Sequence, residues 1–463
     1  MSSLADRIRG VLQTPGQKGP GLHQLEVREP ATPEPVVSGF SRTDPGNNLK
    51  SVLGGEWRRH DSASCFVVET RREPSSAYGG ETVGVLASRF AEAAAGASLV
   101  AGSPASSPFV FFDLETTGLS GGAGTYAFLF GCGSFEDDGA FVTRQYLLVR
   151  FDDERALLAS VGRELARAGA LVSFNGKSFD APVLETRYLY HRLEWMGGGL
   201  PHLDMLPVAR RFWKRDDVAA AGESSCSLVA LEQKLLGARR QGDVPGFEIP
   251  SRYFHFVRTG DARPLRAVFE HNRRDLLSLA ALTARALHLV RSGPEATGDP
   301  REALALGHVY DRAGLAVRAR DAYLRAVSLT GASTAQAGAA TLHGASMAFT
   351  DTSMVLSDAS MASLRIAALR ALALASRRSR AYGEAAGYWR QILDVRGCPR
   401  HVGCEASEAL AIHHEHRVRD LAAAKAFALR SLESGTHWNE AVRYRLARIE
   451  RKMSASDRGA LLD

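Results

Sequence analysis

The stretch FVFFDLETTGLSGG, residues 109–122, joins an apolar run to two carboxylates and a glycine-rich turn. Residues 109–114 have the composition of a buried strand. Residues i and i+2 of a strand point to the same face, so Asp113 and Glu115 project together at its carboxyl end. Two neighbouring carboxylates repel one another unless a cation lies between them. The stretch therefore indicates a divalent cation site, and oxygen ligands favour Mg²⁺ or Mn²⁺.

Two later motifs carry further acidic side chains. In LVSFNGKSFDAPVLETR (171–187), Asp180 follows an expected strand and lies in the first turn of a helix. In EHNRRDLLSLAAL (270–282), His271 stands four residues before the last acid, on the same helix face. Four oxygen ligands from separate elements would hold two divalent ions about 3.5–4 Å apart. These ligands are Asp113, Glu115, Asp180 and Asp275.

Strand and helix signals alternate between residues 109 and 290. We expect strands at 109–114, 125–132, 141–149, 171–174 and 203–206, and helices at 153–168, 178–194, 227–236 and 265–290. The sequence EDDG at 136–139 is typical of a hairpin turn. A hairpin followed by alternating helices and strands predicts an α/β domain with a mixed sheet flanked by helices, over residues 108–292.

The sequence before this domain has a different composition. Residues 1–50 are rich in Pro, Gly, Ser and charge, and we expect them to be mostly disordered. Residues 51–107 contain short strand-like pieces and end in the linker-like AGSPASSP at 101–108. We therefore interpret 51–107 as a short strand-containing lead-in and linker.

Residues 300–463 are alanine-rich and helical in pattern. Several residues have the spacing of a tetratricopeptide repeat: Leu306, Gly307, Tyr310, Ala319, Tyr323 and Ala326. Weaker copies follow at 385–392 and 423–427. Residues 330–363 are small and polar, which fits a degenerate repeat or a flexible insertion, and we favour a poorly packed helix pair. The sequence predicts an all-α, tetratricopeptide-like domain, with a generic helical bundle as the alternative.

Charge and cysteine content indicate which partners and which redox compartment the protein could have. The formal net charge is +6, and residues 291–463, with 24 basic and 18 acidic side chains, account for all of it. A polyanionic partner is therefore allowed there. Five scattered cysteines, without a CxxC pair, predict a reduced cytoplasmic protein. We find no apolar run of about 18–20 residues, so we expect no membrane partner.

The three acidic motifs together resemble those of the DEDD (DnaQ-like) 3′–5′ exonucleases, a branch of the ribonuclease H-like fold. The resemblance rests on FDLETTG, FNGKSFD and HNRRD, in that order, and covers about residues 109–290. Within that superfamily the chain looks most like the YprB-like proteins, because PHLDMLPVARRFW (201–213), LEQKLLG (231–237) and IPSRYFHFV (249–257) are similar to that group.

The resemblance implies roles for individual residues. Asp113 resembles the metal-bridging aspartate and Glu115 its partner, while Asp180 and Asp275 resemble the aspartates of the second and third motifs. Well-studied members place a tyrosine four residues, or a histidine five residues, before the last aspartate. Here His271 stands four before. It is thus a candidate general base, or a residue that merely orients the phosphate or the water.

Other residues near these motifs are candidates for substrate contact. The turn after the first motif lets backbone approach a ligand closely, and we assign substrate binding to Thr116, Thr117, Gly118 and Asn175. An ordinary loop, and a strand-ending hydrogen bond from the Asn175 side chain, are the alternatives. Lys177, Arg273 and Arg274 would meet phosphate or be exposed helix charges. We interpret Asp204 as structural.

The sequence thus predicts a metal-dependent phosphodiester hydrolase. It would be a 3′–5′ exonuclease that uses two Mg²⁺ or Mn²⁺ ions on single-stranded DNA or RNA. The alternative is a module that binds nucleic acid without cutting, with the helical repeats as a scaffold for a protein partner.

Overall fold

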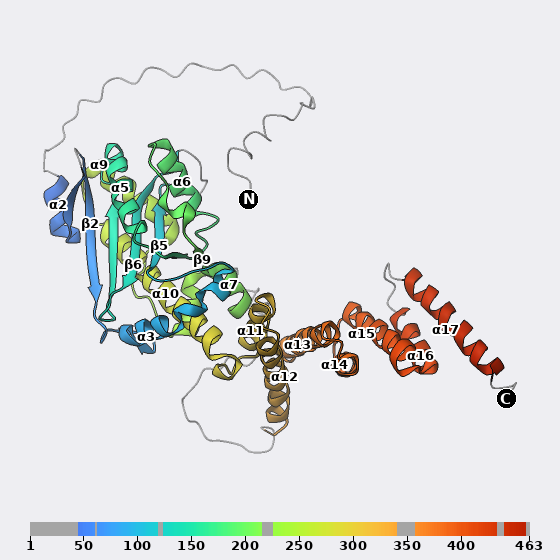
Figure 1. Ribbon diagram of the computed structural model, residues 1–463. Coiled ribbons are helices and arrows are strands. Elements are labelled where there is room, and N and C mark those ends of the chain that lie inside the picture. The colour runs from blue at the N-terminus through green and yellow to red at the C-terminus, as the bar shows by residue number, and fades with distance from the viewer. Residues whose placement is uncertain are drawn as a thin grey trace, which may run out of the picture. The chain divides into compact units, whose positions relative to one another are not determined.

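The computed structural model describes residues 45–60, 63–118, 124–214, 226–339, 357–432 and 439–459 (Figure 1). The part of the predicted disordered segment up to residue 44 lies outside this description. Residues 45–50, however, begin helix α2 (Pro45–Leu53). This helix is held in place because Leu49 is fully buried and the Asn48 side chain donates to the carbonyl oxygen of Gly260 at 2.6 Å.

Seven strands of the described residues form one mixed sheet, as the sequence predicted (Figure 1). Their order is β1 (Glu56–His60), β2 (Ala63–Arg72), β7 (Phe141–Leu147), β6 (Ala127–Phe135), β5 (Phe109–Thr116), β8 (Ala170–Ser173) and β9 (His202–Asp204). The pairs from β1 to β5 are antiparallel, whereas β8 and β9 run parallel to β5. The predicted turn joins β6 and β7, where Phe135 pairs with Phe141.

The lead-in segment is part of this sheet. Strand β2 pairs with β7 along its length, from Phe66–Leu147 to Arg72–Phe141. The sheet therefore begins well before residue 108, where the sequence predicted the domain to start. Sequence periodicity misses this arrangement because it is a pairing between segments about 70 residues apart. A small hairpin of β3 (Ala77–Tyr78) and β4 (Glu81–Thr82) then leads to α3 (Val83–Ala93) and α4 (Ala97–Ala101).

Helices cover both faces of the sheet. One face packs against α3, α4, α7 (Met205–Trp213) and the second half of α10 (Leu265–Ser292). The other face packs against α5 (Glu154–Leu165), α6 (Asp180–Tyr190) and α9 (Ile249–Thr259). Strand β5 is buried on both faces, with Phe109 and Phe111 in the first core and Val110, Phe112 and Leu114 in the second. A central strand with two covered faces explains the continuous apolar run.

Three elements of this domain, one strand and two helices, differ from the sequence prediction. The expected strand at 203–206 ends at Asp204, because its side chain accepts from the Leu206 amide at 3.0 Å and caps α7. The expected helix at 227–236 is a short α8 (Leu228–Leu231) that continues as a π-helix, Glu232–Leu236. Helix α9 has no counterpart in the prediction.

Two helical segments are, by length and composition alone, apolar enough to cross a membrane, although charged residues interrupt both of them. The first spans Val83–Ala101 and the second is α13 (Asp358–Arg378). Both contribute to the interior instead. Phe90 and Ala97 of the first segment are in the main core, and Leu369 of α13 packs with its helical neighbours. Buried core helices have this same composition.

The described residues after 300 are mostly helical, as predicted. Its helices are α11 (Pro300–Arg312), α12 (Ala316–Ala339), α13, α14 (Tyr382–Asp394), α15 (Arg400–His413), α16 (Leu421–Leu432) and α17 (Asn439–Gly459). Each packs against the next. Gly307 lets α11 and α12 approach, since a β-carbon there would lie 2.2 Å from the ring of Tyr323. Half of the small polar segment, residues 340–356, lies outside the described residues, and the tetratricopeptide assignment stays a prediction.

Candidate active site

The two carboxylates of the first motif lie at the carboxyl end of β5. Asp113 and Glu115 follow Phe109 and Phe111 on the same face of the strand, and both are partly buried. The first half of that face is closed by α3 and α10. The second half meets α10 where the helix passes from one core to the other, between Phe269 and Leu276. The predicted third-motif residues are in this part of α10.

Asp113 is held by a buried chain of amides that the sequence did not reveal. The Asn272 side chain donates to Asp113 Oδ2 at 2.9 Å and accepts from Gln145 Nε2 at 2.9 Å. Both amide residues are fully buried. Gly131 makes room for them, because a β-carbon there would lie 2.0 Å from Asn272 Oδ1. The chain fixes the orientation of Asp113 relative to α10.

Asp180 is the first residue of α6 and is only 6% exposed. Burial, and then the charge of Asp204, raise the pKa of Asp180 to about 7. Gly176 leaves space beside it, since a β-carbon there would lie 3.1 Å from Asp180 Oδ2. A helix N-terminus favours a carboxylate, yet here burial dominates, so Asp180 lacks the compensation that a cation would supply.

Asp275, the fourth predicted carboxylate, is paired within the protein. It accepts a hydrogen bond from Arg240, which also contacts Glu232 at 2.7 Å and Asp243 at 3.0 Å. The Arg240 side chain is only 5% exposed. Burial acts to lower the pKa of Arg240, but the charges of Asp275 and Glu232 raise it well above its usual value. Asp275 is therefore compensated by a buried cation while its charge still acts on Asp113 and Glu115.

His271 lies in the site between two carboxylates. Its Nδ1 atom is 2.8 Å from Asp243 Oδ1, and its Nε2 atom is 3.4 Å from Asp275 Oδ2. Burial acts to raise the pKa of Asp243, but hydrogen bonds from His271 and Arg240 hold it below 3.8. Asp243 is therefore an ionised partner for the ring, and neither ring nitrogen is left for a water molecule in this arrangement.

The four predicted carboxylates influence one another strongly. Burial raises the pKa of Asp113 well above its usual value, and the charges of Asp275, Glu115 and Asp180 raise it further. The pKa of Glu115 is also raised, by burial and then by Asp275, Asp180 and Asp243. Segments that are far apart in the sequence thus bring these acids into one neighbourhood.

The donor set fits a divalent cation in its chemistry but is not assembled around one. Within the described residues, Asp113, Glu115 and Asp180 have no cationic side chain among the causes of their raised pKa values. Carboxylate oxygens are the ligands that Mg²⁺ and Mn²⁺ prefer. In the described part of the chain, however, no three His, Cys, Asp or Glu side chains are close enough to enclose an ion.

Comparisons with known proteins agree with the fold and the position of these motifs. The family model described as the RNase_H superfamily matches residues 110–287. Those residues form a ribonuclease H superfamily domain. The chain is also similar to the "Uncharacterized protein YprB" of Bacillus subtilis (strain 168), with 37% identity over 201 residues. The match covers 42% of this chain and 46% of that protein, so it spans just under half of the relative's length.

Two of the predicted substrate-binding residues of the ribonuclease H superfamily domain form hydrogen bonds within the turn after β5. Thr116 Oγ1 donates to the Gly118 carbonyl at 2.9 Å, and Thr117 Oγ1 accepts from the Tyr126 amide at 3.0 Å. These bonds shape the turn after β5, whose residues 119–123 lie outside the described structure. Among the described residues, nothing lies within 4 Å of a β-carbon built on Gly118.

Asp204 organises the loop before α6 and so supports Asp180. It accepts from the amides of Asn175 at 2.7 Å and Lys177 at 3.1 Å, in addition to capping α7. The structural interpretation of Asp204 is therefore confirmed. Asn175 has a left-handed backbone, with φ of 70°, and an exposed side chain. Its backbone amide, not the predicted side-chain hydrogen bond, ends the strand region.

Two of the basic residues proposed to meet phosphate are already paired. Arg273 and Arg274 both contact Glu270, at 2.7 and 2.9 Å. Lys177 instead has an exposed side chain within the loop of the second motif. Sequence reasoning also missed Arg240, Asp243 and Asn272. Only Asn272 carried a local signal, as an amide inside the HNRRD motif that introduces a core helix.

Proposed function

We propose that this protein is a metal-dependent nuclease, and that it acts as a DEDD-type 3′–5′ exonuclease on single-stranded DNA or RNA. The observation that carries the proposal is the meeting of four carboxylates from β5, α6 and α10, three of them without a cationic partner in the described residues. Ribonuclease H superfamily membership of residues 110–287 supports nuclease-like chemistry. The whole protein's substrate stays part of the proposal.

Asp113, Glu115, Asp180 and Asp275 are the residues that would hold two Mg²⁺ or Mn²⁺ ions. Bound divalent ions activate a water molecule and stabilise the leaving oxygen of a phosphodiester. The protein's own contribution is to hold Asp113 through Asn272 and to keep Asp180 in a buried helix turn. Both devices restrict the carboxylates before substrate arrives, which is the preorganisation that catalysis requires.

His271 has the contacts expected of a base once Asp275 rotates away from it. Asp243, which is ionised, accepts the Nδ1 proton of the ring and leaves the Nε2 lone pair free. That nitrogen would then take a proton from the attacking water. The alternative role, in which the ring only orients the water or phosphate, uses the same bond to Asp243.

The test is hydrolysis of 5′-labelled single-stranded DNA and RNA in Mg²⁺ or Mn²⁺, beside an Asp113→Asn variant. An asparagine at this position still accepts from Asn272, so the fold is retained. We expect stepwise shortening from the 3′ end by the wild-type protein and a loss of about a thousand-fold or more in the variant. Equal cleavage by the two proteins would show that another protein or another site cuts the strand.

The second candidate is a module that binds nucleic acid without cutting it. It is favoured by the contact of Asp275 with Arg240 and by the absence, in the described residues, of three side chains placed to enclose an ion. Binding of single strands with no hydrolysis in either metal would support it. Cleavage that depends on Asp113 would exclude it.

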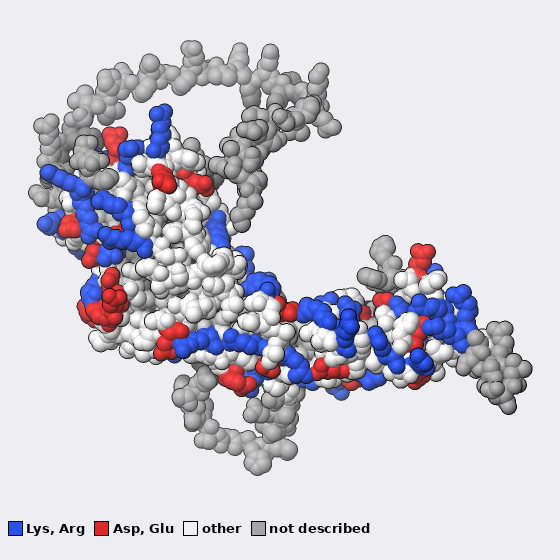
Figure 2. Space-filling model, viewed as in Figure 1, with Lys and Arg blue, Asp and Glu red and all other residues white. Residues whose placement is uncertain are grey.

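The helical region is proposed as a surface for a protein partner or for the nucleic acid. On the face shown in Figure 2, Lys and Arg side chains are spread over these helices among Asp and Glu. Partner capture requires the full chain, because α11 and α12 share the main core with α10 and a fragment from residue 300 would expose it. We also propose a reducing, cytoplasmic setting, since the buried thiols of Cys65 and Cys132 form no disulfide.

A further inference from the structure

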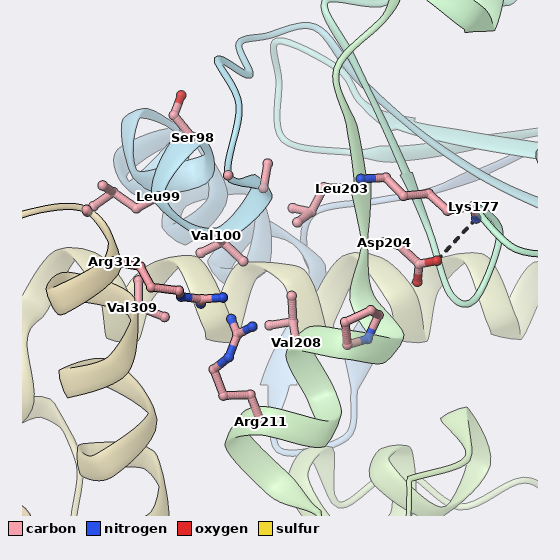
Figure 3. A pocket seen from close by; sticks show the side chains of 14 residues that line it. Ser98, Leu99, Val100, Lys177, Leu203, Asp204, Val208, Arg211, Val309 and Arg312 are labelled. Atoms are coloured by element: carbon pink, nitrogen blue, oxygen red, sulfur yellow. Dashed lines mark hydrogen bonds between the residues drawn. The ribbon is translucent and has the colours of Figure 1, made fainter. Parts of the chain in front are cut away.

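A cavity of about 510 Å³ lies beside the carboxylate site, between the ribonuclease H superfamily domain and the first helix after it (Figure 3). Its walls come from α4, the loop after β8, β9, α7 and α11. Leu99, Val100, Leu203, Val208 and Val309 form an apolar wall. A cavity of this size is in the range that holds a nucleotide-sized ligand.

Three cationic side chains line the same cavity, against one carboxylate. Arg211 of α7 and Arg312 of α11 point their guanidinium groups toward one another, and Lys177 reaches in from the opposite side (Figure 3). The carboxylate, Asp204, is already satisfied by three backbone amides. The lining therefore carries an excess of two positive charges.

The two arginines have no acidic partner within the described residues. Arg312 donates only to the carbonyl oxygen of His308, at 3.3 Å, and Arg211 has no hydrogen bond or ion pair there. Arg211 is partly buried, and burial together with the charge of Arg312 lowers its pKa below 12.5. The two guanidinium groups face one another without an anion between them. The proposed catalytic site shows the opposite case, in which carboxylates lie without a cation.

The walls of the cavity are held rigidly. The indole nitrogen of Trp213, in α7, donates to Glu302 of α11 at 2.8 Å, and Arg285 of α10 donates to the same carboxylate at 2.8 Å. Glu302 is 3% exposed. Leu306 and Tyr310 of α11 belong to the same apolar core as α10. The positions of Arg211 and Arg312 are therefore fixed by buried contacts, not by a loose meeting of two domains.

The cavity adjoins the loop that leads to Asp180. Asp204 lines the cavity and accepts from the amides of Asn175 and Lys177, in the loop that precedes α6 and its first residue, Asp180. Lys177, on the cavity wall, stands three residues before Asp180 in the loop that Asp204 holds. A strand whose end lies at the carboxylates would pass Lys177 to reach the two arginines.

Other basic groups of the described residues lack these properties. A second cavity, of about 540 Å³, is rich in arginine, but Arg58 and Arg144 there already contact Glu69, and none of its residues is among the charges that act on the four carboxylates. In the basic run at 443–452, Arg448 and Lys452 pair with the buried Glu415. Among the cavities of the described residues, the one beside Asp180 combines unpaired arginines with proximity to the carboxylates.

We propose that Arg211, Arg312 and Lys177 bind a backbone phosphate of the single-stranded nucleic acid upstream of the end held at the carboxylates, with the adjoining nucleotide against the apolar wall. This inference rests on the proposed function for the direction of the strand. Guanidinium groups suit it because their planar donors match phosphate oxygens. Helix α11 thereby becomes part of the substrate channel.

The test is binding of a fluorescent single strand of about twelve nucleotides to the full-length protein in EDTA, measured by anisotropy over a range of salt. The variants are Arg211→Ala, Arg312→Ala and the double variant. Arg210→Ala is the matched control, because Arg210 is the neighbouring exposed arginine of α7 and does not line the cavity. Circular dichroism spectra of the four variants, compared with the wild type, serve as the control for folding.

We expect each single variant to bind about tenfold more weakly and the control to bind as the wild type does. The slope of log affinity against log salt should fall in magnitude by about 0.7 for each phosphate that the variant no longer neutralises. Unchanged affinity and slope in the double variant would overturn the inference, and so would a wild-type protein that binds no single strand. Because the assay involves no hydrolysis, binding that depends on these arginines supports the inference even if no cleavage occurs and the proposed function fails.

Discussion

The replacement of Asp180 by asparagine should stabilise the metal-free protein while it removes a proposed ligand. The pKa of Asp180 rises from 3.8 to about 7 in the folded state. Each pKa unit corresponds to about 1.4 kcal/mol, so at pH 8 the ionised carboxylate costs the folded state about 4 kcal/mol. Asparagine removes this cost. It also removes a favourable interaction with the α6 N-terminus of about 0.5 kcal/mol, which leaves a net gain of about 3.5 kcal/mol.

The pH dependence of this gain follows from linkage. Because the folded-state pKa of Asp180 is raised, the folded protein binds more protons than the unfolded chain between pH 3.8 and about 7. The free energy of unfolding of the wild type therefore falls as pH rises through this window. The Asp180→Asn variant lacks the contribution of residue 180 to this decrease, whereas Asp113 and Glu115 still contribute. Its advantage should be below about 1 kcal/mol near pH 4 and should reach its full value by pH 8.

The assay is urea denaturation of wild type and variant in EDTA at pH 4 and pH 8, followed by tryptophan fluorescence. Asp138→Asn is a suitable control with the opposite sign. The amide of Ala140 and the guanidinium of Arg71 lower the pKa of Asp138, so its replacement should destabilise the protein at pH 8. The reasoning would be refuted if Asp180→Asn did not raise the free energy of unfolding at pH 8. It would also be refuted if the increase were the same at pH 4 and pH 8.

Four further results are expected. Mn²⁺ at about one hundred times its dissociation constant should stabilise the wild type by about 2.7 kcal/mol but Asp180→Asn by less, and equal shifts in melting temperature would contradict the ligand role. Asn272→Ala should cost about 2–3 kcal/mol in urea denaturation, because it removes the buried hydrogen bond to Asp113 and one of the two acceptors of the Gln145 amide; a decrease under about 0.5 kcal/mol would show that the amide chain is not required. Gly131→Ala should destabilise the domain through the clash with Asn272, whereas Gly387→Ala, which meets nothing within 4 Å, should not; the same melting temperature for both would count against the packing argument. His271→Ala should reduce kcat by about 10²–10⁴ and remove the acidic limb of the pH–rate profile if Nε2 is the base, and an unchanged limb would assign it the orienting role.

The sequence was most informative where structure is local. Alternation along residues 109–116 placed Asp113 and Glu115 on one face of β5, and the EDDG turn correctly joined β6 and β7. The separation of His271 and Asp275 likewise placed them on one face of α10. Side-chain direction repeats every two residues on a strand and every 3.6 on a helix, so these relations are written in the order of residues. The mixed α/β domain and the following helical region were predictable for the same reason.

What the sequence could not determine depends on pairings between distant segments. The alignment of β2 with β7, the amide chain from Gln145 through Asn272 to Asp113, and the contact of Arg240 with Asp275 each join residues more than 30 positions apart. The cavity likewise exists only because α7 and α11 pack together. Residue order carries periodicity, which identified the carboxylates. Burial, charge compensation and cavities arise when the cores close, so the partner of each carboxylate, and the arginines left without one, were decided by the tertiary structure alone.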